Sequence, residues 1–238
     1  LGAGGTIRMG NNGIINVDNG GILEVIGTST LTSTITGNTS GDRYYLNVNS
    51  GGTIKARDYY FSGMALPGVY VKSGATIDPQ NNFSKGSFSN PQAGGVCLQI
   101  ENNQYFIGSD SIYSLRFPQN PLSGTRNIKK INSLGVIDIY DWSGDLAGPN
   151  YEDDPYNLVN WNVVNTITWV GGYGTGSTRY DWNVPQNWDL NRLPTEDDKV
   201  VINNTGYACY LRNMPDTVSI RELRVNGPFY LVKEASSN

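Results

Sequence analysis

A four-residue motif returns four times in the first third of the chain and constrains the fold more than any other feature. Its copies are GGTI at residues 4–7, GGIL at 20–23, GGTI at 51–54 and GATI at 74–77, so that their starts lie 16, 31 and 23 residues apart. Between the copies, Ile, Val and Leu alternate with polar residues, which is the periodicity of short β-strands. Gly and Asn separate these stretches and favour tight corners. A corner that returns with each set of strands predicts a β-solenoid, in which successive coils stack.

We therefore expect an all-β protein with very little helix, because no stretch carries an apolar stripe at the 3.6-residue period. A right-handed parallel β-helix is predicted over residues 1–139. An aromatic and acidic joint follows at residues 140–166, and a short second β-rich unit, expected to be truncated, at residues 167–238. The alternative is a β-sandwich, which also needs many short strands. The recurring corner favours the solenoid, because a sandwich has no reason to repeat one turn sequence.

Composition excludes several classes of protein. The 17 Lys and Arg residues against 21 Asp and Glu give a net charge of −4, which argues against a nucleic-acid partner. No apolar run approaches the ~18 residues of a membrane span, so direct membrane insertion is not expected. The chain has no histidine, which removes Ser-His-Asp and Cys-His catalysis and His-ligated metals. Cys97 and Cys209 are too few for a zinc site, and either pair or stay as buried thiols.

The densest acidic cluster lies in and just before GPNYEDDPYNLVNW, residues 148–161. A turn is the preferred interpretation, because a residue before proline is pushed towards extended backbone and Asp-Pro favours turns. A structural Ca²⁺ site is the alternative, although the spacing does not fit an EF-hand loop. A catalytic acid pair is the least favoured. The candidate calcium ligands are Asp141, Asp145, Glu152, Asp153 and Asp154. A second acidic run next to a proline, PTEDDKV at 194–200, suggests that similar acidic segments are repeated at structural boundaries of the chain.

The tryptophans are confined to a short part of the chain. Flat aromatic rings stack well on sugars, so a glycan-binding strip is one interpretation. The preferred one is that the rings cover the end of one solenoid and the start of the next, because Trp buries a large area and the joint lacks regular coils. The residues are Trp142, Trp161, Trp169, Trp182 and Trp188.

The sequence DWSGDLAGPNYEDDPYNLVNW is similar to a segment found in very large secreted surface proteins of Bacteroidota, where it follows a β-helical block. The next segment resembles the motif that opens the following block in those proteins. The matching residues are Trp169, Gly171, Trp182, Asn187, Trp188, Pro194, Asp197, Asp198, Val200 and Ile202. The resemblance covers residues 83–202. It implies an extracellular protein at the outer cell surface, exported by the type IX route and akin to gliding-motility adhesins.

Two short sequences, DSI and DTV, resemble the O-glycan acceptor motif of Bacteroidota and make Ser111 and Thr217 candidate acceptors. Overall we expect a structural or adhesive segment of a surface protein, used for adhesion, gliding or scaffolding, and not an enzyme. Its expected partners are surface glycans, other surface proteins and the type IX secretion machinery, with no cofactor beyond structural calcium. A carbohydrate-binding module that uses the Trp and Tyr band is the alternative. A β-helix polysaccharide lyase or hydrolase ranks last, because the carboxylates of the repeat region are scattered and no Lys/Arg cluster joins them. These carboxylates are Glu24, Asp42, Asp58 and Asp78.

Overall fold

The computed structural model describes residues 1–173, 180–196, 198–203, 209–211, 218–226 and 231–233. The chain forms two compact units, Leu1–Val163 and Val164–Asn238. Every pairing between strands in the described residues is parallel, and these residues contain no α-helix. The helical elements described are three 3-10 turns: η1 (Gly108–Asp110), η2 (Pro149–Tyr151) and η4 (Pro185–Asn187). The predicted all-β class with very little helix is confirmed.

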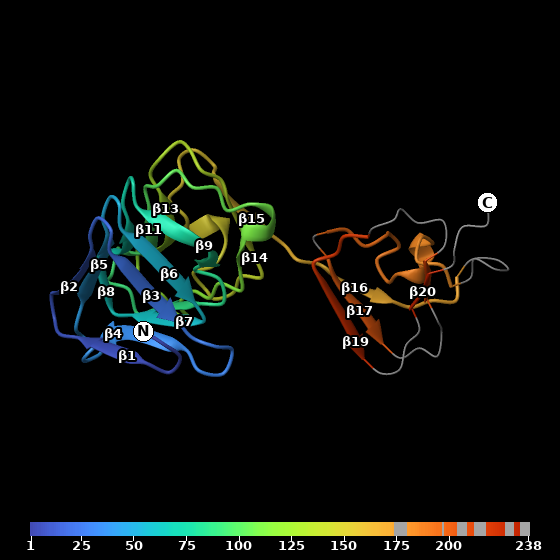
Figure 1. Ribbon diagram of the computed structural model, residues 1–238, viewed down its shortest axis with the longest axis horizontal. Helices are drawn as coiled ribbons and strands as arrows, with labels where there is room; N and C mark the ends of the chain where they lie inside the picture. Colours follow the sequence, from blue (N-terminus) through green and yellow to red (C-terminus); the bar gives the residue numbers. More distant parts are fainter. Residues whose placement is uncertain (174–179, 197, 204–208, 212–217, 227–230, 234–238) are drawn as a thin grey trace. The chain divides into compact units, whose positions relative to one another are not determined.

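Strands of the first unit form four parallel sheets (Figure 1). The first sheet has the order β1-β4-β7-β10, made of Thr6–Met9, Ser33–Gly37, Tyr59–Ser62 and Ser87–Ser89. The second has the order β13-β11-β8-β5-β2, made of Arg126–Lys130, Val96–Ile100, Met64–Val71, Tyr44–Val48 and Gly13–Val17. The third is β3-β6-β9, made of Ile22–Ile26, Thr53–Arg57 and Thr76–Asn82. The fourth is β12-β14-β15, made of Ile112–Tyr113, Ile137–Tyr140 and Val159–Asn162.

The chain visits the first three sheets in rotation. Strands β1, β2 and β3 belong to the first, second and third sheets, and β4 to β6 and β7 to β9 repeat that order. We call each such stretch a coil. Register keeps like residues above one another, so that Val48 pairs with Val17 on one side and with Val71 on the other. Inward side chains of consecutive coils therefore form continuous columns.

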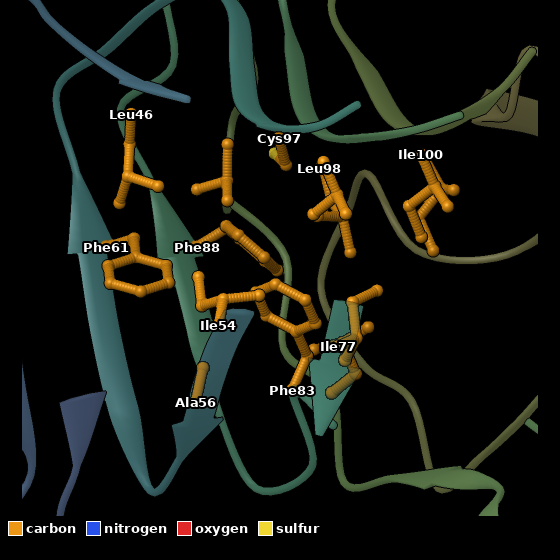
Figure 2. Close-up of a cluster of buried hydrophobic side chains, with 14 of the residues drawn as sticks. Leu46, Ile54, Ala56, Phe61, Ile77, Phe83, Phe88, Cys97, Leu98 and Ile100 are labelled. Atoms are coloured by element: carbon orange, nitrogen blue, oxygen red, sulfur yellow. The ribbon is translucent and has the colours of Figure 1, made fainter. Parts of the chain in front are cut away.

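These columns make the core of the first unit. Leu46, Ile54, Phe61, Phe88 and Leu98, from the three sheets, point towards one another (Figure 2), and none is more than 2% exposed. The Phe88 ring lies 6.0 Å from the Phe61 ring and 5.9 Å from the ring of Phe117, measured between centroids. Truncating such a residue to Ala typically costs about 3–5 kcal/mol. The core thus stabilises the stacking of coils through long-range contacts.

Three copies of the repeated Gly motif, those that lead into β3, β6 and β9, form one corner of the coils, while the copy at residues 4–7 leads into β1. Gly20, Gly51 and Gly74 have φ angles of 76°, 76° and 75°, a left-handed conformation that favours glycine. Gly20 donates its N–H to the carbonyl of Gly51 at 2.9 Å, and Gly51 donates to that of Gly74 at 2.8 Å. A side chain at Gly51 would also overlap the Asn19 amide. The motif therefore marks a stacked column of corners.

The boundary between the units falls after Val163. Strand β15 pairs with β14 in parallel, so residues 140–163 of the predicted joint lie within the first unit as its last coil. The second unit has two parallel sheets, β16-β17-β19 and β18-β20. Their strands are Thr166–Trp169, Lys199–Asn203 and Glu222–Asn226 in the first, and Cys209–Leu211 and Leu231–Lys233 in the second.

Candidate functional site

The acidic corner that precedes β15 is organised by Asp154. Its carboxylate accepts backbone N–H bonds from Val159 at 2.7 Å, from Tyr156 at 3.3 Å and from Leu158. These donors follow Pro155 directly and lead into the strand. A short acidic side chain that accepts local N–H bonds fixes a turn in the way a helix cap does. Asp154 thus sets the path by which the chain enters β15.

The other four predicted calcium ligands have separate partners. Asp153 Oδ2 lies 2.8 Å from Lys129 Nζ, and Glu152 accepts the indole N–H of Trp161. Asp145 accepts the backbone N–H of Asn120 at 2.9 Å, and Asp141 accepts the Ser114 hydroxyl at 2.5 Å. In the described part of the chain, no three Asp, Glu, Cys or His side chains gather as a metal-binding group. The structure therefore does not bring the five carboxylates to one point.

Burial affects one of these acids. The pKa of Glu152 is raised because desolvation disfavours its charged form, and the N–H of Trp161 opposes this shift. A carboxyl group with a raised pKa is a common feature of general acids. Here the Glu152 carboxylate accepts the indole N–H of Trp161, whose ring packs against the core. The arrangement is that of a packing contact.

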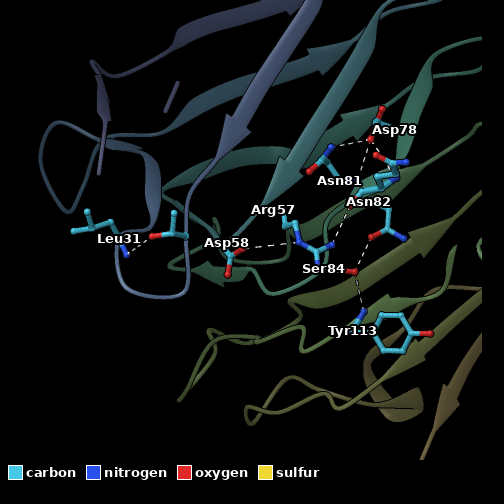
Figure 3. A network of polar contacts seen from close by, with 10 residues as sticks. Leu31, Arg57, Asp58, Asp78, Asn81, Asn82, Ser84 and Tyr113 are labelled. Carbon is cyan, nitrogen blue, oxygen red and sulfur yellow. Dashed lines mark hydrogen bonds and ion pairs between the residues drawn. The ribbon is translucent and has the colours of Figure 1, made fainter. Parts of the chain in front are cut away.

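Acidic residues of the third sheet hold corners in a similar way (Figure 3). Asp78 accepts the backbone N–H of Asn81 at 2.9 Å, as well as the amide of the same side chain at 2.9 Å. Asp58 lies 3.9 Å from Arg57 Nε. The Ser84 hydroxyl donates to Asn82 and accepts the N–H of Tyr113 in the next coil. The bond between Ser84 and Tyr113 links neighbouring coils, whereas the contacts of Asp78 and Asp58 are local.

Trp142 and Trp161 belong to the first unit, where they pack against its core while remaining partly exposed. Register places Trp161 beside Ile139, as the last member of an inward column. Its ring centroid lies 5.8 Å from that of Phe117 and 5.7 Å from that of Trp142, edge to face in both cases. The two indoles therefore cover the last coil of this unit.

The other three tryptophans form the core of the second unit. Trp169, Trp182 and Trp188 are 0%, 4% and 1% exposed, with Trp188 in edge-to-face contact with both others. Trp188 donates its indole N–H to the carbonyl of Trp182 at 2.9 Å. Buried rings offer no free face to a sugar. The predicted five-residue strip is thus divided into two clusters, of which only the first has partly exposed rings.

Asn187, a residue of the opening motif, joins the segments around this aromatic core. Its side chain accepts the N–H of Tyr173 at 2.7 Å and donates to the carbonyl of Asp181 at 2.9 Å. Its own carbonyl accepts the N–H of Val170 at 2.9 Å. A fully buried amide that hydrogen-bonds to two other segments helps to specify the local fold. Asn187 therefore holds residues 170–173 and Asp181 beside the aromatic core.

The second acidic corner is built on Asp198. Arg192 donates two hydrogen bonds to its carboxylate, at 2.6 and 2.7 Å, and Thr195 adds its N–H at 2.7 Å and its hydroxyl at 3.0 Å. The pKa of Asp198 is lowered to about 2, first by the Arg192 hydrogen bond and then by those from Thr195. Asp198 is 1% exposed. Asp198 therefore fixes the turn through which the chain enters β17.

Lys130 is the most unusual buried residue, and the sequence reading did not single it out. It pairs in register with Ile100 in an inward column and is fully buried. Its ammonium donates to the carbonyls of Asn102 at 2.9 Å and Leu134 at 2.7 Å. Burial lowers its pKa. Strand alternation from the inward Ile128 was the signal that could have found it.

The remaining predicted positions have simple environments. Ser111 is buried at 1% exposure, which leaves its hydroxyl inaccessible to a glycosyltransferase in the folded state. Thr217 lies outside the described residues. Cys97 and Cys209 are both free and buried, and burial raises the pKa of each thiol. Neither thiol has the lowered pKa of a reactive cysteine.

No family model, curated protein or solved structure matches the chain. Within its described residues, no helix is both long and apolar enough to cross a membrane. The structure thus defines an all-β protein with parallel sheets, whose acidic and aromatic residues contact other parts of their own fold.

Proposed function

We propose that the chain is a structural and adhesive segment of an extracellular protein displayed on the outer cell surface. In this proposal the first unit is a right-handed parallel β-helix, and the second unit begins another β-rich block. Rotation of the strands through three sheets supports the helix, and parallel crossovers are nearly always right-handed. The resemblance to Bacteroidota surface proteins supports export by the type IX route and a role in adhesion, gliding or scaffolding.

One observation carries this proposal: the acidic and aromatic residues best suited to catalysis or ligand binding make contacts that hold the fold together. Asp154 and Asp198 fix strand entries, and Trp188 fills a core. Outward positions of neighbouring coils bond mainly to each other, as Asn47 does to Asn16 at 3.0 Å and Lys55 to Glu24 at 2.7 Å. A stack of coils with paired polar faces suits a stiff spacer.

A carbohydrate-binding module is the second candidate, and the partial exposure of Trp142 and Trp161 favours it. Tyr151 and Tyr156, which are 38% and 52% exposed, lie in the same acidic corner of the chain. Aromatic rings beside hydrogen-bonding groups are typical of sugar-binding surfaces. Calcium at this corner also stays a prediction, because its carboxylates are partly exposed.

The test uses the full chain labelled with 5-fluorotryptophan and observed by fluorine NMR. Calcium, a chelator and a panel of bacterial, algal and plant glycans are added in turn. We expect no glycan to move any resonance, because the rings serve packing. A saturable shift of Trp142 and Trp161, with the three buried indoles unchanged, would overturn the structural proposal in favour of a glycan-binding module. Trp142→Phe and Trp161→Phe assign the two reporting signals, and a calcium-dependent shift of Trp161 would place an ion at the corner.

A further inference from the structure

The outward side of the first sheet carries an unusual set of side chains, which we call the hydroxyl face. Ile35, Phe61 and Phe88 point into the core, so the residues on either side of them in each strand lie on the outward side. Register stacks these outward residues into two columns that run across successive coils. Every member of the two columns carries a hydroxyl group or is an arginine. The first column consists of Thr6, Thr34, Tyr60, Ser87, Arg116 and Ser143.

The second column has a buried hydroxyl in its middle. It consists of Arg8, Thr36, Ser62 and Ser89. Ser62 is only 8% exposed, and its hydroxyl makes no hydrogen bond to another described residue. The hydroxyl still reaches the surface, because it is not one of the fully enclosed side-chain atoms that have no partner. A polar group buried to this degree usually has a hydrogen-bond partner, and a ligand on this face can supply it.

The polar side chains of the hydroxyl face are free, whereas many of those on the second sheet bond to one another. On the second sheet, Asn47 donates to Asn16 at 3.0 Å across neighbouring coils. On the hydroxyl face, the one side-chain hydrogen bond between described residues joins Arg116 to Ser143, at 2.9 Å. The face therefore keeps most of its hydrogen-bonding groups available for a ligand.

The hydroxyl face is locally positive, although the chain as a whole has a net charge of −4. Its two columns contain Arg8 and Arg116, which are both exposed, and no carboxylate. Asp42 lies beside the ends of β4 and β7, where its carboxylate accepts the N–H of Thr39 at 2.9 Å. Exposed charges more than about 8 Å apart are largely screened at physiological ionic strength, so the local cations dominate. The face is therefore complementary in charge to an anionic ligand.

The spacing of the columns indicates the kind of ligand. Neighbouring parallel strands lie about 4.8 Å apart, so Arg8 and Arg116, four coils apart, are separated by about 19 Å along the stack. Rows of small hydroxyl groups with the Tyr60 ring among them suit the hydroxyls and flat faces of sugars. A protein partner would need an apolar centre, and a nucleic acid would need a denser row of cations for its phosphates.

We propose that the hydroxyl face binds a linear acidic polysaccharide that lies along the stack of coils. Arg8 and Arg116 bind carboxylates of the polysaccharide, and the hydroxyls between them, with Ser62 in the middle, bond to its sugar hydroxyls. This inference gives a ligand class to the adhesive role proposed above and rests on that role, whereas the role as a stiff spacer does not depend on it.

Isothermal titration calorimetry of the full chain with a hyaluronate oligosaccharide, which carries a carboxylate on every second sugar, tests the proposal. We expect saturable binding that weakens as salt is added. The uncharged methyl ester of the same oligosaccharide should bind at least about fivefold more weakly, and Arg8→Gln and Arg116→Gln should each weaken hyaluronate binding by a similar factor. Ser62→Ala should weaken it about threefold. Both arginines are exposed, so their variants should fold normally.

Lys72→Gln is the matched control, because it removes one positive charge beside Tyr70 on the second sheet and should leave binding unchanged. An equal loss in this variant would show that net charge alone attracts the ligand, and it would overturn the site. Absence of binding, equal binding of the methyl ester, or tighter binding of single-stranded DNA would also overturn it, and the spacer role would still stand. A shift of the Trp161 fluorine signal that the arginine variants do not alter would place the glycan at the indoles and overturn both proposals.

Discussion

Asp154 and Asp198 occupy similar places in the two units and are stabilised by different means. Each lies in an acidic run near a proline and fixes the entry to a strand, β15 or β17. Asp154 accepts backbone N–H bonds at a partly exposed corner, whereas Asp198 is buried and accepts two bonds from a guanidinium. Similar sequences thus make corners of unequal strength, because a buried carboxylate depends much more on its cation than an exposed one does on local amides.

The largest expected effect is on the second unit. Asp198→Ala removes the buried carboxylate that joins Arg192 and Thr195 and breaks all four of its hydrogen bonds. We expect the free energy of unfolding of the second unit to fall by about 3 kcal/mol. Urea unfolding followed by fluorine NMR measures it, because Trp169, Trp182 and Trp188 report this unit while Trp142 and Trp161 report the first.

Glu196→Ala is the matched control, since Glu196 is an exposed acid two residues away in the same turn. It should change stability by less than about 0.5 kcal/mol. Equal effects of the two substitutions would show that the acidic run acts through its total charge and not through the Arg192 contact.

The next largest effect is expected from lowering the pH, which should remove the stabilising contribution of Asp198. The folded pKa of Asp198 is about 2, below its usual value, so the unfolded chain takes up this proton more readily. Its contribution is present above about pH 4 and is lost as the pH falls through 2. Thermal unfolding of the second unit should show this loss, and Asp198→Asn should remove it. Wild-type and Asp198→Asn curves that stay parallel from pH 4 to pH 2 would contradict the assignment.

Smaller changes are expected in the first unit. Asp154→Ala removes a local cap and should lower its free energy of unfolding by about 1–2 kcal/mol. Asp153→Ala, which breaks a half-exposed pair with Lys129, should cost less than about 1 kcal/mol. The Trp142 and Trp161 signals in urea measure both. A loss at Asp154 as large as that at Asp198 would remove the distinction between the corners.

The strands and corners of the first unit could be predicted because their signals are local. Alternation marked the stretches that form β2, β3 and β5, and repeated glycines marked the corner at Gly20, Gly51 and Gly74. The parallel pairing itself joins residues tens of positions apart, as in Val17 with Val48. Only the repetition of the motif indicated it.

Partners of the polar groups could not be predicted. Asp145 bonds to Asn120, and Asp153 pairs with Lys129, through a register that composition does not reveal. The acidic run predicted a turn, with a calcium site as the alternative, but it did not show which partner each carboxylate has. The tryptophans were expected first to pack at the end of one unit and the start of the next, and the structure places two in the first unit and three in the second. Their closeness in sequence did not show that the boundary falls after Val163.

Lys130 also bears on how a repetitive chain finds its correct stacking. Coils with matching aliphatic columns can pair one coil out of step and still bury most of their apolar side chains. In that shifted arrangement the ammonium would lie beside Val71 instead of Ile100 and would lose the carbonyl of Asn102, which belongs to the neighbouring coil. Burying a cation without acceptors is costly. A single inward lysine thus penalises slippage and fixes the number of coils that stack beneath it.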